Sequence, residues 1–422
     1  MIDLRRTYAE SLDANDELAV FRSRFLIADP DRIYMDGNSL GRLPQAAASR
    51  ASQVVMDEWG EGLIGGWNAG WYEAPRRVGD AIGALIGAGP GQVIVTDSTS
   101  VNLFKLVAAS LALRPERHRI ITDSLNFPSD LYILQGAAEL LGRGHTVVSI
   151  GMQAGGEVPD LGDLSAAVDS DTAIVVRSHA AYKSAYLYHM ESVTRLAHER
   201  GALVVWDLSH SVGVVPIELD RWEVDFAVGC TYKYLNGGPG APAFLYVSTP
   251  LQERARSPIW GWFGRDSPFA FDLRYEPAPG AARFLAGTPP ILSLLVMEAA
   301  LEPTIEAGTS RLRRKSVAQT EYLIALADEL LAPLGVAVAS PRESERRGSH
   351  VSLRHPEGYR VAQALIDEMK VIPDFREPDL LRFGCAPLYT TYADIWEAID
   401  RTRRVIGERM FERYSPVRRG VT

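Results

Sequence analysis

The chain has 422 residues, 46% of them hydrophobic and 23% charged, with a net charge of −9 at pH 7. This composition is typical of a globular protein with a large core, and its acidic balance argues against nucleic-acid binding. Its two cysteines cannot form a disulfide framework, and no apolar run has the length of a signal peptide or a membrane span, so we expect a cytoplasmic protein without membrane partners.

The middle of the chain alternates short apolar runs with longer helical patterns. The first two runs, 92–97 and 118–123, are each followed by a helical pattern, at 100–114 and 129–143. Further strand-like runs lie at 145–150, 172–178, 202–209, 225–232 and 242–248, with a helical pattern at 188–200. Nearly continuous apolar strands separated by helices predict an α/β fold with a mostly parallel, seven-stranded sheet flanked by helices.

This alternation predicts a large domain over residues 51–295. We expect the N-terminal segment, 1–50, to pack with a smaller α+β domain formed by 296–422. The patterns that support the smaller domain are helical at 293–330 and 359–369 and strand-like at 350–355 and 380–386.

Polar side chains follow the carboxyl ends of the predicted strands, which is where ligands bind in sheets of this kind. Hydroxyl, carboxylate, imidazole and amine groups gather there. They belong to Thr99, Ser100, Ser129, Asp130, Ser178, His179, Asp207, Ser209, His210, Tyr232 and Lys233. We expect these groups to converge at one edge of the sheet.

Two of these strand ends allow either a structural or a functional interpretation. The hydroxyls of Thr99 and Ser100 open a helix, where they could simply cap it or could help its free N–H groups to bind an anion. Asp207 could likewise cap a helix, or it could hold a proton on a heteroaromatic nitrogen. A metal site is a third possibility for Asp207 and His210, but no further cluster of ligands completes it.

Lys233 lies in the segment YKYLNGGPGAP, whose glycines allow the backbone to approach a ligand closely. Alone, it would be a surface lysine; in a desolvated pocket its amine could form a Schiff base. An amine, a carboxylate, an anion-binding helix start and the aromatic Phe127 are together the groups that pyridoxal phosphate requires. The sequence therefore predicts a pyridoxal-phosphate site.

Segments along nearly the whole chain resemble kynureninase, a pyridoxal-phosphate hydrolase of fold type I, and they occur in the order of that family. They are YMDGNSLGRLP (34–44), WNAGWYEAPRRVGD (67–80), NFPSD (126–130), DLSHSVG (207–213), YKYLNGGPGAPAFLYV (232–247), GWFG (261–264), GTPPILSL (287–294) and LRFGCAPLYTT (381–391). The lysine segment alone indicates only the wider aminotransferase-like group. GWFG, GTPP and NSLG narrow the resemblance to kynureninase.

The resemblance implies a role for each matching residue. Lys233 would bind the cofactor covalently and act on the substrate Cα proton, Asp207 would pair with the pyridine nitrogen, and Phe127 would stack on the ring. The other cofactor contacts that it implies are Thr99, Ser100, Asp130, Ser178, His210 and Tyr232, with Trp262 and Thr288 coming from the facing subunit of a homodimer. The implied substrate contacts are Arg382, which would grip the α-carboxylate, Asn38 and Trp67.

Some of these residues also have a plain structural interpretation. Arg382 could be a surface arginine on a strand, and Trp67 and Thr288 could be walls of a pocket. The last two also look like the pattern of family members that prefer kynurenine to 3-hydroxykynurenine. The segment 182–188 matches the family less well, which leaves substrate contacts there open.

The activity that the resemblance implies is hydrolysis of L-kynurenine, or of its 3-hydroxy derivative, to anthranilate and L-alanine in tryptophan catabolism. Tyr232, beside Lys233, would donate and accept protons. Alternatives are a cysteine desulfurase-like lyase, an aminotransferase and a non-catalytic cofactor-binding relative. A desulfurase needs a mobile cysteine upstream of Arg382, but residues 300–380 contain none, and Cys230 and Cys385 lie in apolar runs typical of buried positions.

Overall fold

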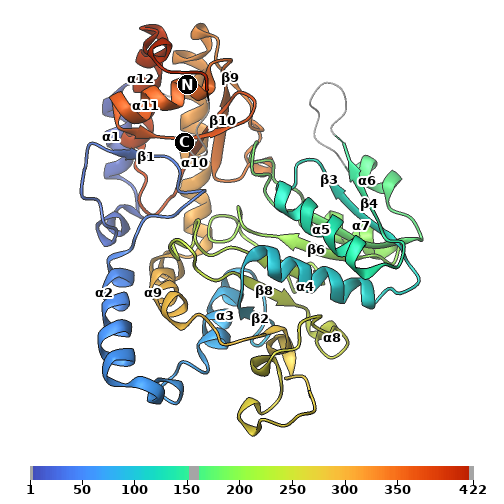
Figure 1. The fold of residues 1–422 in the computed structure, drawn as a ribbon. Coiled ribbons are helices and arrows are strands. Elements are labelled where there is room, and N and C mark those ends of the chain that lie inside the picture. The colour runs from blue at the N-terminus through green and yellow to red at the C-terminus, as the bar shows by residue number, and fades with distance from the viewer. Residues whose placement is uncertain (1–2, 152–160, 418–422) are drawn as a thin grey trace.

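A central sheet of seven strands organises the larger part of the computed structural model, which describes residues 3–151 and 161–417 (Figure 1). The strands are β2 (Val93–Val95), β3 (Arg119–Asp123), β4 (Thr146–Ile150), β5 (Thr172–Ser178), β6 (Leu203–Asp207), β7 (Phe226–Gly229) and β8 (Phe244–Val247). Their spatial order is β2-β8-β7-β6-β5-β3-β4, and only β8 runs antiparallel to its neighbours. The predicted mostly parallel, seven-stranded sheet is confirmed.

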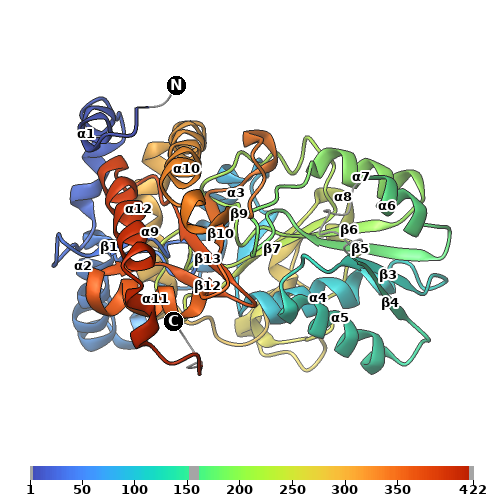
Figure 2. The ribbon, with the colours of Figure 1, turned by 90° about the horizontal axis from the view of Figure 1, so that it is seen from above.

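Helices cover both faces of this sheet. They are α3 (Ala74–Leu85), α4 (Thr99–Ala112), α5 (Pro128–Leu141), α6 (Leu161–Ala167), α7 (Met190–Glu199), α8 (Thr249–Gln252) and α9 (Ile291–Ala307). Figure 2 shows α6 and α7 on one side of the strands and α4 and α5 on the other. Alternate residues of a strand pack into separate hydrophobic cores on the two faces of the sheet. Val204 packs with α6 and α7, and Val205 packs with α4 and α5. Burial on both faces explains why these strands, apart from the partly exposed edge strand β4, are continuous apolar runs.

A second unit lies beside the sheet and contains both ends of the chain (Figure 1). Its antiparallel sheet has the order β12-β13-β10-β9, and a separate parallel pair joins β1 to β11. The strands are β1 (Ile33–Tyr34), β9 (Ala337–Val338), β10 (His350–Arg354), β11 (Val371–Ile372), β12 (Asp374–Arg376) and β13 (Leu380–Gly384). Its helices are α1 (Arg6–Ala14), α10 (Thr309–Leu330), α11 (Gly358–Met369) and α12 (Tyr392–Gly407), whereas α2 (Gln45–Gln53) packs on α9. The helical pattern at 293–330 forms two helices, α9 and α10, which are separated at Gly308, where φ is +74°.

The N-terminal segment shares a core with the C-terminal part of the chain: Ala9, Ile33 and Met35 pack in the same cluster as Leu323 and Phe383. The boundaries at residues 50 and 295 stay a prediction, and the first two and last five residues of those domains lie outside the described residues. Among the described residues, no helix has the length and apolar character needed to cross a membrane.

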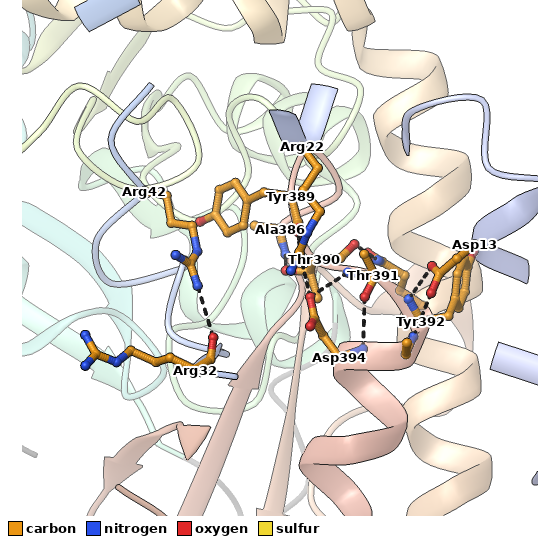
Figure 3. A network of polar contacts seen from close by, with 12 residues as sticks. Asp13, Arg22, Arg32, Arg42, Ala386, Tyr389, Thr390, Thr391, Tyr392 and Asp394 are labelled. Atoms are coloured by element: carbon orange, nitrogen blue, oxygen red, sulfur yellow. Dashed lines mark hydrogen bonds and ion pairs between the residues drawn. The ribbon is translucent and has the colours of Figure 1, made fainter. Parts of the chain in front are cut away.

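Polar contacts at the start of α12 fasten the N-terminal segment to this unit (Figure 3). The carboxylate of Asp13 accepts a hydrogen bond from the N–H of Tyr392 at 2.7 Å, and Arg22 Nη1 lies 2.6 Å from Asp394 Oδ2. Thr391 and Asp394 cap the helix reciprocally. The N-terminal segment therefore places the carboxylate of Asp13 at the start of α12 and pairs Arg22 with Asp394, the residue that caps the helix.

Candidate active site

A cavity of about 200 Å³ lies where the carboxyl ends of the central strands meet the smaller unit. It brings together most of the side chains that the sequence predicted. These are Asn38, Thr99, Ser100, Phe127, Asp130, Asp207, His210, Tyr232, Lys233 and Arg382. Ser129 and Ser209, which were expected at the strand ends, also border it, together with Ser39, Tyr182 and Arg376, for which no site role was predicted. His179, which was expected to converge with these groups, borders instead a separate, larger cavity of about 620 Å³ that also contacts Trp222.

Lys233 follows β7, and its amine is held by a histidine. Its Nζ lies 2.9 Å from Nε2 of His210. Burial, with the nearby charge of Lys233, lowers the pKa of His210 well below its usual value, so the imidazole is neutral. A neutral ring that accepts at Nε2 carries its proton on Nδ1. His210 thus acts as an acceptor that orients the amine of Lys233.

Two carboxyl groups face this amine from neighbouring elements. Asp207 ends β6, and its Oδ1 accepts hydrogen bonds from the backbone N–H (2.9 Å) and the hydroxyl (2.6 Å) of Ser209. No hydrogen bond to Asp207 Oδ2 is present within the described part of the chain. Asp130, in the first turn of α5, is buried and its Oδ2 has no hydrogen-bond partner among the described residues. Burial, and then the charge of Asp207, raise the pKa of Asp130 well above its usual value.

The start of α4 faces the same cavity. Ser98 caps the helix by accepting from the N–H of Val101 at 3.4 Å, and Thr99 and Ser100 form its first turn. The hydroxyl of Ser100 lies 3.0 Å from that of Ser129 at the start of α5. Free N–H groups and the helix dipole favour an anion at such a position.

Arg382 approaches the cavity from β13 in the smaller unit. Its side chain is 1% exposed, so the interpretation as a surface arginine is wrong. Nη2 donates to the hydroxyl of Ser39 at 2.7 Å and pairs with Asp374 Oδ2 at 2.6 Å, while Nη1 donates to the carbonyl of Tyr182 at 2.6 Å. The arginine is therefore fixed by three separate parts of the chain.

The segment 36–41 enters between β13 and the lysine loop, and glycines make room for it. A Cβ on Gly384 would overlap the side-chain amide group of Asn38, and a Cβ on Gly41 would overlap the carbonyl oxygen of Lys233. The N–H of Gly41 donates to the carbonyl of Tyr232 at 2.8 Å. This close packing positions Asn38 and Ser39 at the cavity.

Four predicted residues do not border the cavity within one chain. Ser178 ends β5 opposite Asp207, and its N–H donates to the side chain of Asn126. Trp67 and Trp262 both pack on Phe263, with ring centroids 5.4 Å and 4.4 Å from it. Thr288 also lies outside the set of lining residues. The cofactor and substrate roles of these residues stay predictions.

Both cysteines are buried and free, as their apolar surroundings predicted. Burial raises the pKa of the Cys385 thiol to about 12. Burial likewise raises the pKa of Cys230. A buried thiol with a raised pKa is a poor nucleophile, which argues against the chemistry of a cysteine desulfurase.

The family model and the curated relatives that match this chain both carry the name kynureninase. The family described as "Kynureninase C-terminal domain" matches residues 312–402. The kynureninase of Pseudomonas fluorescens is 47% identical over 94% of both chains, and that of Burkholderia pseudomallei (strain 1106a) is 45% identical over 95% of both.

Solved structures with the same fold include the apo cysteine desulfurase from Thermococcus onnurineus NA1. It has a TM-score of 0.78 and 20% identity, and the match covers 92% of this chain and 98% of that one. The cystine C–S lyase C-DES, in complex with cysteine persulfide, has a TM-score of 0.75 and 18% identity, with 89% and 98% covered. At these identities the structures show the fold-type-I architecture alone.

Proposed function

The chain belongs to the kynureninase family, and we therefore propose that it hydrolyses L-kynurenine to anthranilate and L-alanine with bound pyridoxal phosphate. The observation that carries this proposal is the placement of Lys233 in one cavity with Asp207, Asp130 and the start of α4. The pathway that the family name indicates is tryptophan catabolism.

The residues of the cavity fit pyridoxal phosphate. Asp207 Oδ2 has no hydrogen-bond partner among the described residues and can pair with a protonated ring nitrogen. The start of α4, with Thr99 and Ser100, suits the phosphate. The half-exposed ring of Phe127, which contacts the Tyr182 ring edge to face, can stack on the cofactor ring. When bound, the cofactor supplies an electron sink for the charge left on the substrate carbons.

The overall reaction breaks the bond between Cβ and Cγ of kynurenine. The oxygen of water joins Cγ, which leaves as the carboxylate of anthranilate, and Cβ takes up a proton to become the methyl group of alanine. Within this reaction, Lys233 binds the cofactor and, with its amine released, moves the proton at Cα. His210, by accepting from Nζ at 2.9 Å, keeps that amine oriented.

Tyr232 is the proposed proton donor for Cβ. The adjacent Cys230 thiol, and then burial, raise the pKa of its hydroxyl, so the group retains its proton at neutral pH. Arg382 binds the α-carboxylate of the substrate. Asn38, in the N-terminal segment, lies against the guanidinium group of Arg382.

We also propose a homodimer that completes the site. Large apolar side chains that are more than half exposed project from two regions, at Trp59, Leu63 and Ile64 and at Trp260, Phe269 and Phe271. The second region is an aromatic cluster, because Trp262 contacts both Phe269 and Phe271. Exposed apolar surface of this kind is typical of subunit interfaces. A second copy would cover it and bring Trp262 and Thr288 to the phosphate of its partner.

Two finer expectations stay predictions. The preference for kynurenine over 3-hydroxykynurenine rests on the pattern at Trp67 and Thr288. The cytoplasmic location rests on the composition of the chain.

One spectrum and one assay test the proposed function. We expect the purified protein to absorb in the visible range and to release fluorescent anthranilate from L-kynurenine. Lys233→Ala should abolish both properties, because it removes the amine that binds the cofactor. Lys370→Ala, at an exposed lysine that pairs with Asp29, is the matched control and should change neither.

The two readouts separate the parts of the proposal. A colourless protein that stays colourless after addition of pyridoxal phosphate would contradict the cofactor. A coloured protein that yields no anthranilate would keep the cofactor and reject the substrate.

A further inference from the structure

Arg382 has few donors left for a ligand. A guanidinium carries five N–H groups, one on Nε and two on each Nη. With the Asn38 amide oriented to accept, Nε lies 2.9 Å from its oxygen. Nη2 is engaged by Ser39 and Asp374, and Nη1 by the carbonyl of Tyr182. Only one N–H, on Nη1, is then free of described partners, whereas a bidentate grip on a carboxylate needs two.

A second guanidinium borders the same cavity. Arg376 lies on β12, and its Nε donates to Asp374 Oδ2 at 2.7 Å. The structure records no hydrogen bond between either Nη group of Arg376 and the described residues. Its side chain is 32% exposed, compared with 1% for Arg382. The donors that are open to a ligand in this half of the cavity therefore belong mainly to Arg376.

The strand register explains why the two arginines meet. Asp374 lies opposite Arg382 in the antiparallel pair β12–β13, and Arg376, two residues further along β12, projects from the same face as Asp374. Asp374 Oδ2 lies 2.6 Å from Arg382 Nη2 and 2.7 Å from Arg376 Nε. One buried carboxylate thus holds both guanidinium groups in place.

We propose that Arg376 contacts the carboxylate of the substrate together with Arg382, and that Asp374 positions both arginines without touching the substrate. The inference deepens the proposed function and rests on it, since it concerns an amino-acid substrate. Each arginine supplies N–H donors to the incoming carboxylate, so that Arg382 can keep its contacts with Ser39 and Tyr182.

Arg376→Gln in the holoenzyme tests this contact. We expect KM for L-kynurenine to rise about 10- to 100-fold, because a charge-assisted contact is lost, while kcat changes much less. The dissociation constant for L-alanine, read from the cofactor absorbance, should rise by a similar factor. Inhibition by kynuramine, which lacks the carboxylate, should stay unchanged. Arg376→Lys keeps the charge beside Asp374 and should recover part of the loss.

Arg354→Gln is the control, because Arg354 is an exposed arginine on β10 of the same sheet and pairs with Asp379. It should leave all of these constants as in the wild type. Unchanged KM and alanine binding in both Arg376 variants would overturn the proposal, and so would an equal loss of kynuramine binding. If the wild-type holoenzyme bound alanine but released no anthranilate, the proposed function would fail, while the alanine titration would still test Arg376.

Discussion

The carboxyl group of Asp36 makes the stability of the folded protein depend on pH. Asp36 lies where the N-terminal segment enters the site. Burial, and then the charge of Asp374, raise the pKa of Asp36 to about 6. Its Oδ1 is buried without a hydrogen bond among the described residues and lies 3.9 Å from Arg382 Nη2. The unfolded chain has an ordinary aspartate there, with a pKa of about 3.9.

Asp36→Asn should therefore stabilise the protein above pH 6. Between about pH 4 and 6 the native state binds a proton that the unfolded state has released, so wild-type stability falls as the pH rises through this window. At pH 8 we expect the free energy of unfolding of the variant to exceed that of the wild type by about 2 to 3 kcal/mol, and at pH 4 by almost nothing. Urea unfolding of both proteins in one cofactor state measures this. Asp31→Asn, at an exposed carboxylate, should show no such dependence.

Single residues also show where prediction from the sequence stops. Lys233, Asp207 and Thr99 could be placed because each follows a strand whose apolar run is visible in the sequence. Arg376 and Tyr182 could not, because they reach the cavity through contacts between distant parts of the chain. Arg376 stands on a strand of only three residues, and the carbonyl of Tyr182 accepts from Arg382, 200 positions away.

At the scale of elements, the segment 36–41 joins the two halves of the site. It is hydrogen-bonded to the residue before Lys233 through Gly41, and it packs against Gly384 through Asn38. A Cβ on Gly41 would overlap the carbonyl oxygen of Lys233 and lie 2.8 Å from Cα of Asn236. Because both obstacles are backbone atoms, the segment or the loop must move.

Gly41→Ala should reduce kcat/KM by a factor of about 10 to 100, since small displacements at a reacting centre are costly. The overpacking should also lower the free energy of unfolding by about 1 to 3 kcal/mol. Steady-state kinetics and thermal unfolding measure the two effects. In Gly136→Ala, which places a methyl group into open space on α5, activity should stay at the wild-type level. A fully active Gly41→Ala would show that the segment does not set the site.

The elements that the sequence predicted are those with the strongest local signals. Six of the seven central strands are almost fully buried, and this produces the apolar runs that reveal them, while the edge strand β4 is partly exposed. The start of α12 also carries a local signal, the capping box of Thr391 and Asp394, which would have located that helix. The π-helical turn at Val54–Glu61 has no comparable signature, because its hydrogen-bond pattern depends on packing.

At the scale of the whole molecule, the homodimer decides whether the site is complete. If Trp262 acts in the partner's site, two inactive variants should restore each other. Mixing Lys233→Ala with Trp262→Ala by unfolding and refolding creates hybrid dimers in which one site has both native residues. Random pairing then makes about a quarter of all sites active. Anthranilate release before and after mixing measures the recovery.

The matched control pairs Lys233→Ala with Asp207→Asn, since both residues border the cavity of one chain. Their hybrids contain no intact site and should stay inactive. Recovery in the control, or none in the test mixture, would contradict the shared site. The sequence alone could indicate this arrangement only through resemblance, because the single chain packs Trp262 on Phe263 and not at the cavity.

The path of residues 3–44 has a consequence for dividing this protein into fragments. They supply β1 as the partner of β11, the carboxylate of Asp13 at α12, and Asn38 and Ser39 at the cavity. The segment therefore binds to the rest of the chain much as a separate peptide would bind to a groove. A fragment that starts at α2 would keep Lys233 yet present an empty groove beside it, and a synthetic peptide of the missing residues would be its natural complement.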